Sequence, residues 1–441
     1  MYLSHMNNTQ NFGLLSFILC ISCVLKGQSV EIESLSPLPM RTSNNAVVEG
    51  FINGDPYVYS FGGIDETLVH TGIHSRAFRL DVNANAWEEI APLPDTRPKI
   101  ASSASRVDDI IYIIGGYHVA ANGSEESSAK VHRYDILNNV YLEDGEDIPI
   151  AIDDHVQVVN GPLIYVVSGW NDNNNVQDVQ VYDTRSDSWA MATPVPSGNL
   201  YRCFGCSGVL IEDKIIYYGG AQGFGFPSRK ELRVGTLSPD DPLEITWSLM
   251  TPDESPNSYR NAAAVIEGQP VWIGGSETSY NFDGIAYNGS GGVGPAGKIL
   301  LNDSDGAAPW SEIAAEVPMD LRSAGSLTSE SVVIAGGMKA GQEVTDETLL
   351  LRFSFLPSST EESLSPAGFE VTPTVTTGQT TIHFQNTPEK KGPLKVINMQ
   401  GQLVRSYLPE HRSMNLDLSG LEAGTYLLIH AREVRQLIII D

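Results

Sequence analysis

The chain repeats one short pattern six times, and this repeat constrains its fold more than any other feature. In each copy a β-branched or aromatic run ends at a glycine pair, as in Ile110–Gly116 (IIYIIGG), with Ser-Gly in the third copy. The last glycine of each copy is Gly63, Gly116, Gly169, Gly220, Gly275 or Gly337. Their spacing of 51 to 62 residues suits four strands with their turns. Alternation within the runs favours antiparallel strands, so we expect six four-stranded sheets.

Further marks recur in the copies. A strand ending in aspartate follows the glycine pair, and an aromatic residue stands six positions later; the three pairs are Asp81 and Trp87, Asp135 and Tyr141, Asp183 and Trp189. Later copies have a longer turn before Trp247 or Trp310, and a proline follows in every copy. These marks closely resemble the kelch family over about residues 30–357. The resemblance implies an all-β fold, a six-bladed kelch-type β-propeller, in which strands a to d of each blade follow in chain order and strand a lines the axis.

The two ends of this region predict how the ring closes. The segment Glu31–Pro39 (EIESLSPLP) mimics Trp87–Pro94 (WEEIAPLP), a fourth strand and its proline stop. The sixth copy ends near Pro357 after three strands. We therefore expect a propeller over residues 29–357 in which the N-terminal strand completes the last blade and removes an open sheet edge.

The composition changes after the propeller. Residues 358–367 are rich in Ser, Glu and Pro and predict a linker, and residues 368–441 predict a small β-sandwich C-terminal domain. Ile397–Val404 (INMQGQLV) and Leu416–Tyr426 (LDLSGLEAGTY) resemble the type A sorting domain of the type IX secretion system (T9SS) of Bacteroidetes. The resemblance implies the secretion machinery as partner and a secreted or outer cell-surface location. The alternative is a β-sandwich used for binding or spacing.

The N-terminus predicts a removable segment. Phe12–Leu25 is an apolar run of 14 residues, short for a membrane span and suited to a signal peptide over residues 1–28. Met1–Asn11 carries no Lys or Arg, which departs from the usual signal, and a lipid-modified Cys23 is an alternative. We expect no transmembrane segment after cleavage.

Charge and cysteine usage narrow the function classes. The net charge is −27 and no Lys/Arg-rich run exists, which argues against nucleic-acid binding. Cys203 and Cys206 are the cysteines that remain after signal cleavage. Residues i and i+3 of a regular strand point to opposite faces, so a disulfide would need a local turn. Two small buried residues are the favoured interpretation, with a disulfide or a redox role as alternatives.

Basic residues recur where each strand a begins. Arginine forks suit carboxylates and phosphates, so a ring of them around the mouth of the propeller predicts an anionic ligand. The candidates are Arg41, Arg97, His155, Arg202, Arg260 and Arg322. The alternative is a structural role, because Asp95 and Asp320 stand two residues before Arg97 and Arg322.

Aromatic residues are expected on the same face. Tyr117 and Trp170 directly follow their glycine pairs, and Tyr280 lies in the longest b–c loop, residues 276–298. Aromatic rings beside arginines suit the stacking of a sugar, and ordinary loop packing is the alternative.

No metal, cofactor or catalytic residue is predicted. His70, His74 and His118 lie in loops of the mouth side and His155 begins a strand a, so a site where they converge is a less favoured alternative. The Asp303 turn lacks the acidic residue that closes a calcium loop. We therefore expect a binding protein whose ligand at the d–a and b–c loops is an acidic carbohydrate or a protein.

Two other functions stay open. Some periplasmic kelch propellers that act on sialic acid anomers resemble this chain, which would make it a sialic-acid mutarotase or epimerase with Glu277 or Asp154 as acid or base. A structural adhesion scaffold is the third interpretation.

Overall fold

A computed structural model describes residues 28–250, 254–303, 305–355, 369–384, 393–398, 403–409, 411–421, 423–430 and 433–439. The expected signal peptide up to residue 27 and the expected linker lie outside these residues. The described part divides into Gln28–Phe355 and a C-terminal unit within 369–439, and each is described by itself. No helix in the described part is long and apolar enough to cross a membrane.

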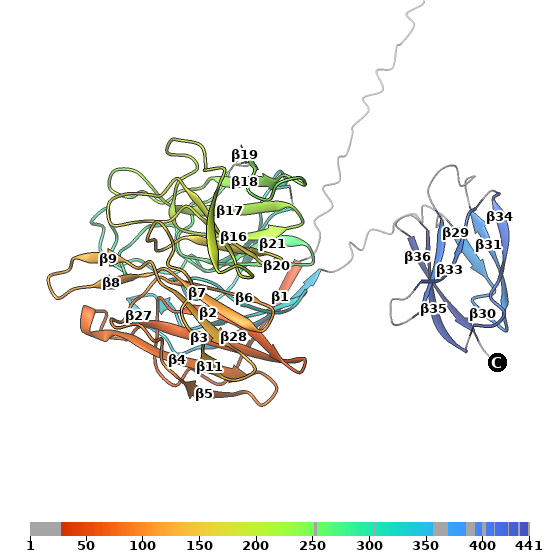
Figure 1. The fold of residues 1–441 in the computed structure, drawn as a ribbon, viewed down its shortest axis with the longest axis horizontal. Coiled ribbons are helices and arrows are strands. Elements are labelled where there is room, and N and C mark those ends of the chain that lie inside the picture. The colour runs from red at the N-terminus through yellow and green to blue at the C-terminus, as the bar shows by residue number, and fades with distance from the viewer. Residues whose placement is uncertain are drawn as a thin grey trace, which may run out of the picture. The chain divides into compact units, whose positions relative to one another are not determined.

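Gln28–Phe355 consists of six antiparallel four-stranded sheets arranged around an axis, which confirms the propeller expected from the repeat (Figure 1). Blades 1 to 3 comprise β2 (Ala46–Ile52), β3 (Asp55–Ile64), β4 (Ile73–Asp81) and β5 (Ala86–Ile90); β6 (Ser103–Val107), β7 (Ile110–Ile114), β10 (Val131–Asp135) and β11 (Val140–Tyr141); and β12 (Val156–Asn160), β13 (Leu163–Val167), β14 (Val179–Asp183) and β15 (Ser188–Ala192). The inner strands β2, β6 and β12 contact one another around the axis.

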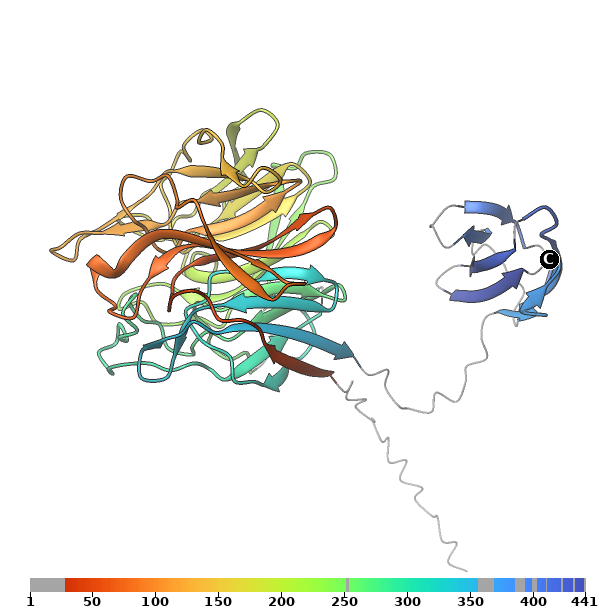
Figure 2. The same cartoon turned by 90° about the horizontal axis from the view of Figure 1, so that it is seen from below.

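Blades 4 to 6 continue the ring. They comprise β16 (Phe204–Ile211), β17 (Lys214–Ala221), β18 (Leu232–Leu237) and β19 (Ile245–Leu249); β20 (Ala262–Ile266), β21 (Gln269–Ile273), β22 (Lys298–Leu301) and β23 (Ser311–Ala314); and β24 (Gly325–Thr328), β25 (Ser331–Ala335), β28 (Thr348–Phe355) and β1 (Gln28–Ser34). The N-terminal strand β1 pairs antiparallel with β28, from Gln28 opposite Phe355 to Ser34 opposite Leu349 (Figure 2). The first strand of the propeller therefore completes the last sheet.

Short elements extend the b–c loops of the propeller. They are the 3-10 helix η1 (His70–Gly72), the hairpin β8 (Tyr117–Val119) with β9 (Glu125–Ser127), and the hairpin β26 (Met338–Lys339) with β27 (Glu343–Val344). Because b–c loops lie on the face where the d–a segments end, these elements build up one face, which we call the mouth face.

The glycine pairs allow the backbone of the next blade to pass close to the end of strand b. Gly115 has φ +67°, and a Cβ added to it would lie 2.3 Å from the carbonyl oxygen of Ile152 in the d–a segment that leads to blade 3. In blade 3 the first position is Ser168, also with positive φ, and its hydroxyl donates to the carbonyl of Cys203 at 2.9 Å. The run of β-branched residues ends at this pair because the neighbouring backbone passes there.

The outer tryptophans and the core also tie adjacent blades. Trp87 donates its indole N–H to Ser36 O at 2.9 Å, and Trp189 donates to Glu146 O at 2.8 Å, each across to the preceding blade. Buried rings such as those of Tyr59 in blade 1 and Tyr134 in blade 2, 5.7 Å apart, fill the space between sheets. The hydrophobic core therefore consists of layers between blades, which leaves the axis free for polar groups.

The C-terminal unit is a two-sheet β structure with its own core. Its strands are β29 (Phe369–Thr372), β30 (Val375–Thr376), β31 (Gln379–Phe384), β32 (Leu394–Asn398), β33 (Leu403–Tyr407), β34 (Ser413–Asp417), β35 (Gly424–His430) and β36 (Glu433–Ile439). They form the sheets β29-β31-β34 and β30-β36-β35-β32-β33. Phe369, Ile382, Leu394 and Leu428 are among the side chains buried between them.

Candidate functional site at the mouth of the propeller

One residue at the start of each inner strand adopts a left-handed backbone conformation. Five of the six are not glycine, and non-glycine residues seldom adopt positive φ unless their surroundings hold them there. We call these six the mouth ring: Asn44 (φ 58°), Ala101 (57°), Asp154 (48°), Gly205 (63°), Arg260 (50°) and Asp320 (62°).

Backbone hydrogen bonds link the mouth ring from blade to blade. The bonds run from Ala101 N to Asn44 O (3.3 Å), from Asp154 N to Ala101 O (3.2 Å), from Gly205 N to Asp154 O (2.9 Å), from Arg260 N to Gly205 O (2.7 Å) and from Leu321 N to Arg260 O (3.0 Å). The side-chain amide of Asn44 donates to the Asp320 carboxylate and completes the circle. The left-handed conformation suits this pattern, because Ala101, Asp154, Gly205 and Arg260 each direct the N–H to one neighbouring ring segment and the C=O to the other.

Three charged side chains of the mouth ring meet a fourth charge at the axis. Arg260 lies 2.7 Å from Asp154 and 3.4 Å from Asp320, and Arg322 lies 3.1 Å from Asp154 and 3.4 Å from Asp320. These four side chains are at most 4% exposed. We call them the axial charge cluster; its two cations and two anions balance, as buried charges require.

The pKa values of Asp154 and Arg260 are both shifted in the direction that favours the charged form. Burial by itself would raise the pKa of Asp154, but Arg260 and Arg322 outweigh it and hold that pKa below its ordinary value. Burial would lower the pKa of Arg260, but Asp154 and its other neighbours raise it well above its ordinary value. The Arg260 guanidinium also contacts two rings, 5.0 Å from the centroid of Tyr259 and 5.3 Å from that of Tyr280.

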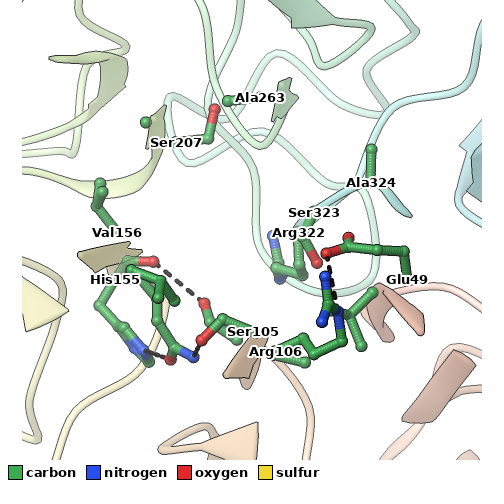
Figure 3. Close-up of a pocket in the computed structure, with 16 residues that line it drawn as sticks. Glu49, Ser105, Arg106, His155, Val156, Ser207, Ala263, Arg322, Ser323 and Ala324 are labelled. Atoms are coloured by element: carbon green, nitrogen blue, oxygen red, sulfur yellow. Dashed lines mark hydrogen bonds and ion pairs between the residues drawn. The ribbon is translucent and has the colours of Figure 1, made fainter. Parts of the chain in front are cut away.

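A polar cavity of about 200 Å³ lies among the inner strands and is bordered by Arg322 (Figure 3). Figure 3 shows side chains from different inner strands around a common space, with Glu49 3.7 Å from Arg106. His155 lines this cavity, where its Nε2 lies 3.2 Å from Gln157 Oε1. Burial lowers the pKa of His155 to about 4, so its ring is neutral at pH 7. His155 therefore belongs to the central channel and not to the mouth.

A second cavity, of about 120 Å³, lies on the mouth face and is bordered by Asp154 and Arg260. We call it the mouth pocket; its lining consists of Tyr117, Glu125, Asp153, Asp154, Trp170, Phe204, Phe226, Arg260, Asn281 and Tyr287. These residues come from the b–c loops of blades 2 to 5 and from the starts of β12, β16 and β20. The axial charge cluster thus borders the mouth pocket through Arg260 and the channel through Arg322.

Aromatic rings form much of the wall of the mouth pocket. Phe226 packs edge-on against Trp170 at 5.3 Å, against Phe204 at 5.4 Å and against Tyr287 at 5.0 Å between ring centroids. Edge-to-face contacts of this kind fix the orientation of each ring. Such a wall offers flat apolar faces to a ligand while the polar groups lie beyond it.

The polar groups of the mouth pocket include a buried acid with a raised pKa. Asp153 is 4% exposed and accepts a hydrogen bond from the Ser127 hydroxyl at 2.6 Å. Burial, together with the adjacent Asp154 carboxylate, raises the pKa of Asp153 well above its ordinary value. Its carboxyl group therefore holds a proton more readily than an ordinary aspartate, and Glu125 from β9 lies on the same pocket.

The structure brings together some of the residues expected from sequence. Arg260, Tyr117 and Trp170 line the mouth pocket, and Arg322 pairs with the same aspartates as Arg260. Tyr280 is fully buried behind Arg260, and its hydroxyl lies 3.4 Å from Asp320 Oδ1. Tyr280 therefore supports the arginine instead of lining the pocket.

The other three arginines do not converge on the axis, which corrects the expectation of one arginine ring. Arg41 is exposed and lies 4.0 Å from Glu66, and Arg97 is exposed and lies 2.8 Å from Glu126. Arg202 donates from Nε to the backbone of Gly198 at 3.3 Å. The reason is register: these arginines precede the mouth ring of their blades by three or four residues, whereas Arg260 is itself a ring residue.

Sequence reasoning missed several lining residues. Phe204 and Phe226 were not singled out, because no residue at an equivalent position in the other copies marks them. The doublet Asp153-Asp154 at the start of an inner strand was the available signal, since two adjacent acids before a buried strand need a special environment. Among the described residues, no group of three or more His, Cys, Asp or Glu side chains is placed to hold a metal ion.

Cys203 and Cys206 form a disulfide, so the favoured expectation of two separate buried residues is wrong. Gly205, with φ +63°, supplies the local turn that a bridge between residues i and i+3 needs. A Cβ on Gly205 would lie 2.4 Å from the Tyr259 ring. The bridge encloses Phe204 of the mouth pocket and Gly205 of the mouth ring.

Comparison with known proteins agrees with this architecture. Residues 51–275 match the family described as the KLHDC2/KLHL20/DRC7 Kelch-repeats domain, and residues 371–439 match the secretion system C-terminal sorting domain. A solved structure titled "Structure of YjhT" superposes with a TM-score of 0.57 at 16% identity, over 73% of this chain and 99% of that one. This likeness shows the fold.

Two curated proteins are similar to parts of the chain. Kelch-like protein 15 of Homo sapiens is 25% identical over 151 residues, which are 34% of this chain and 24% of that protein. N-acetylneuraminate epimerase 1 of Escherichia coli O6:H1 is 25% identical over 264 residues, which are 50% of this chain and 68% of that protein. The chain thus spans about a quarter of the human protein and about two thirds of the bacterial one.

Proposed function

The chain belongs to the kelch-repeat family, and we propose that its propeller binds an acidic sugar in the mouth pocket. Its C-terminal sorting domain points to secretion or attachment at the cell surface. At that location a propeller meets the saccharides of its surroundings. The proposal rests on Arg260, which lines the mouth pocket beside the aromatic wall. Among the described residues, its buried Nε has no hydrogen-bond partner.

Arg260 retains one donor for a ligand. Its Nη atoms pair with Asp154 and Asp320, but its buried Nε has no hydrogen-bond partner among the described residues. A buried donor without an acceptor is costly, so an oxygen of a ligand would stabilise it. Because the axial charge cluster pairs two cations with two anions, recognition of a carboxylate rests on this hydrogen bond and not on long-range attraction.

The aromatic wall supplies the other half of sugar recognition. Trp170, Phe226 and Tyr287 present ring surface beside the polar groups of the pocket. Sugars combine an apolar ring face with hydroxyl groups at the edge, and a site of this composition matches both. The similarity to N-acetylneuraminate epimerase 1 of E. coli favours N-acetylneuraminate as the first sugar to test.

Titration calorimetry of the full chain with N-acetylneuraminate and with neutral galactose tests the proposal. We expect saturable binding of the acidic sugar, weakened about fivefold in Trp170→Ala by loss of one aromatic contact. Arg97→Ala is the matched control, because Arg97 is an exposed mouth-face residue outside the pocket. Absence of binding at millimolar sugar, or equal weakening by both variants, would overturn the proposal.

A second candidate is an enzyme that interconverts forms of such a sugar. Burial raises the pKa of Asp153, and Glu125 lies on the same pocket, so two carboxyl groups suited to act as acid and base stand together. Asp153 would give its proton to the ring oxygen while a base takes the proton of the anomeric hydroxyl, which opens the ring without any other reactant.

Exchange of the anomers of N-acetylneuraminate, followed by NMR, separates the two candidates. Enzymatic function requires faster exchange with the full chain and loss of that acceleration in Asp153→Asn. Binding without acceleration leaves the carbohydrate-binding function and rules out the enzyme.

A further inference from the structure

The loop that carries Phe226 also presents a fully exposed aromatic side chain. Phe224 is 106% exposed, and it follows Gly223 and precedes Gly225, both with positive φ. Phe226 itself has φ 48°, and its N–H bonds to Gly223 O at 3.1 Å. A left-handed phenylalanine persists only where its surroundings hold it. This tight turn places Phe226 in the mouth pocket and leaves Phe224 in solvent.

A groove of about 470 Å³ lies beside Phe224, between the b–c loops of blades 4 and 5. Its sides include the exposed polar residues Asn257, Glu277 and Asn288. Glu277 lies 2.6 Å from Lys298. The ammonium group balances the charge of this carboxylate, so Glu277 does not repel an acidic ligand from the groove. One aromatic face with hydrogen-bonding edges repeats the composition of the mouth pocket on a more open surface.

The groove and the mouth pocket share a wall. Phe226 and Tyr287 line the pocket, and their chain neighbours Gly225, Pro227 and Asn288 line the groove. The wall is held from the blade 5 side, where the Ser279 hydroxyl donates to the carbonyl oxygen of Phe226. The two cavities are therefore adjacent, with the segments that carry Phe226 and Tyr287 between them.

We propose that the groove is a second sugar subsite, so that the propeller binds the terminal residue of a glycan chain in the mouth pocket and the next residues over Phe224. This inference rests on the proposed function and names the ligand class as an oligosaccharide bound at its end. The pocket, at about 120 Å³, takes only part of a sugar residue, whereas the adjoining groove, at about 470 Å³, offers room for what extends beyond it. A sugar ring bound in the groove would cover Phe224, which explains why this side chain is exposed in the free protein.

Calorimetry of the full chain with N-acetylneuraminate and with a lactose-based trisaccharide ending in N-acetylneuraminate tests the subsite. We expect the trisaccharide to bind about fivefold more tightly, since one additional aromatic contact is made. Phe224→Ala removes this advantage and leaves the affinity for the monosaccharide unchanged. Leu137→Ala is the control, because Leu137 is 53% exposed in the turn between β10 and β11, away from the mouth face.

The outcomes separate the subsite from the function on which it rests. Equal affinities for the two sugars, or a Phe224→Ala variant that retains the trisaccharide advantage, overturn the subsite and leave the mouth pocket. Failure of both sugars to bind overturns the proposed function and the subsite together. Self-association that depends on Phe224 in sedimentation experiments, with no trisaccharide advantage, would assign this side chain to a contact between copies of the chain.

Discussion

The axial charge cluster and a second group of buried charges in blade 2 solve the same problem in different places. In blade 2, the Lys99 ammonium lies 3.2 Å from Asp95 and 3.1 Å from His132 Nε2, and His132 Nδ1 lies 2.8 Å from Asp144. We call these four residues the blade 2 cluster. It ties the d–a segment before β6 to β10 within one sheet, whereas the axial charge cluster joins blades 3, 5 and 6.

The two clusters differ in the features that indicate a ligand site. Both clusters bury paired ions, so pairing and burial by themselves indicate only that desolvation has been offset. The axial charge cluster borders two cavities and leaves the Nε of Arg260 without a partner among the described residues. Lys99 by contrast contacts Asp95, His132 and Ser128 with its single ammonium group. A donor left over at a cavity is the mark of the axial charge cluster.

The largest effect expected from this comparison is that of Arg260→Met. The substitution keeps much of the side-chain volume but leaves Asp154 and Asp320 with Arg322 alone, and breaking a buried ion pair costs about 3–5 kcal/mol. Urea unfolding should show this loss in the free energy of unfolding.

Arg202→Met is the matched control for Arg260→Met. Arg202 bonds to one backbone carbonyl, so its loss should cost less than about 1 kcal/mol. Equal losses in the two variants would mean that the axial charge cluster has no special role in joining blades.

The second effect is that of Asp95→Asn in the blade 2 cluster, which we expect to cost about 2–3 kcal/mol at pH 7. Burial would raise the pKa of Asp95, but the contacts with His132 and Lys99 outweigh it and hold the pKa below its ordinary value of 3.8. A lowered carboxyl pKa contributes stability above the unfolded value and loses it as the pH falls below that value.

The acid dependence provides the check on Asp95→Asn. The difference in free energy of unfolding between the wild type and the variant should shrink as the pH falls from 5 to 3. A difference that stays constant over this range would show that Asp95 is not held ionised by the blade 2 cluster.

The fold could be predicted from the sequence because the repeated glycines and tryptophans stand where the backbone or the contact between blades permits few residue types. The six glycine positions stand where a neighbouring segment passes within Cβ distance, as Ile152 does at Gly115, so only small residues fit there. The tryptophans mark contacts between blades for a similar reason, since each indole N–H needs an acceptor in the preceding blade. Local composition therefore predicted the all-β propeller.

The site was only partly predictable because it depends on register between blades. A shift of three or four residues separates Arg41 and Arg97 from the mouth ring, and nothing in a single blade reveals it. Asn44, Ala101 and Arg260 share a backbone conformation but no residue type, so the mouth ring has no sequence signature. Arg260, Tyr117 and Trp170 were found because they lie at or directly beside the constrained positions.

The third effect distinguishes the two clusters at alkaline pH. Burial lowers the pKa of Lys99 from 10.5 to about 8, partly offset by Asp95. Between these values the unfolded chain binds a proton at this residue that the folded chain has released, so stability from Lys99 rises with pH, on the order of 1 kcal/mol per pH unit. The axial charge cluster has no corresponding change, because the pKa of Arg260 is raised.

Urea unfolding of the wild type and Lys99→Met between pH 7.5 and 10 measures this contribution. The free energy of unfolding of the wild type should rise relative to that of Lys99→Met as the pH rises. Parallel curves for the two proteins would mean that Lys99 keeps its proton in the folded state and that the blade 2 cluster is as firmly ionised as the axial one.

The smallest effect is expected at the exposed arginines. Arg97 and Glu126 lie 2.8 Å apart, with side chains 54% and 60% exposed, so water and salt screen their attraction. Arg97→Ala should change the melting temperature by less than about 1 °C, because exposed pairs contribute little. A clear fall in melting temperature that disappears at high salt would show that the ion pair of Arg97 with Glu126 stabilises the fold. An unchanged melting temperature together with unchanged sugar binding is the result expected of a residue outside the mouth pocket, and weaker sugar binding would count against the pocket as the site.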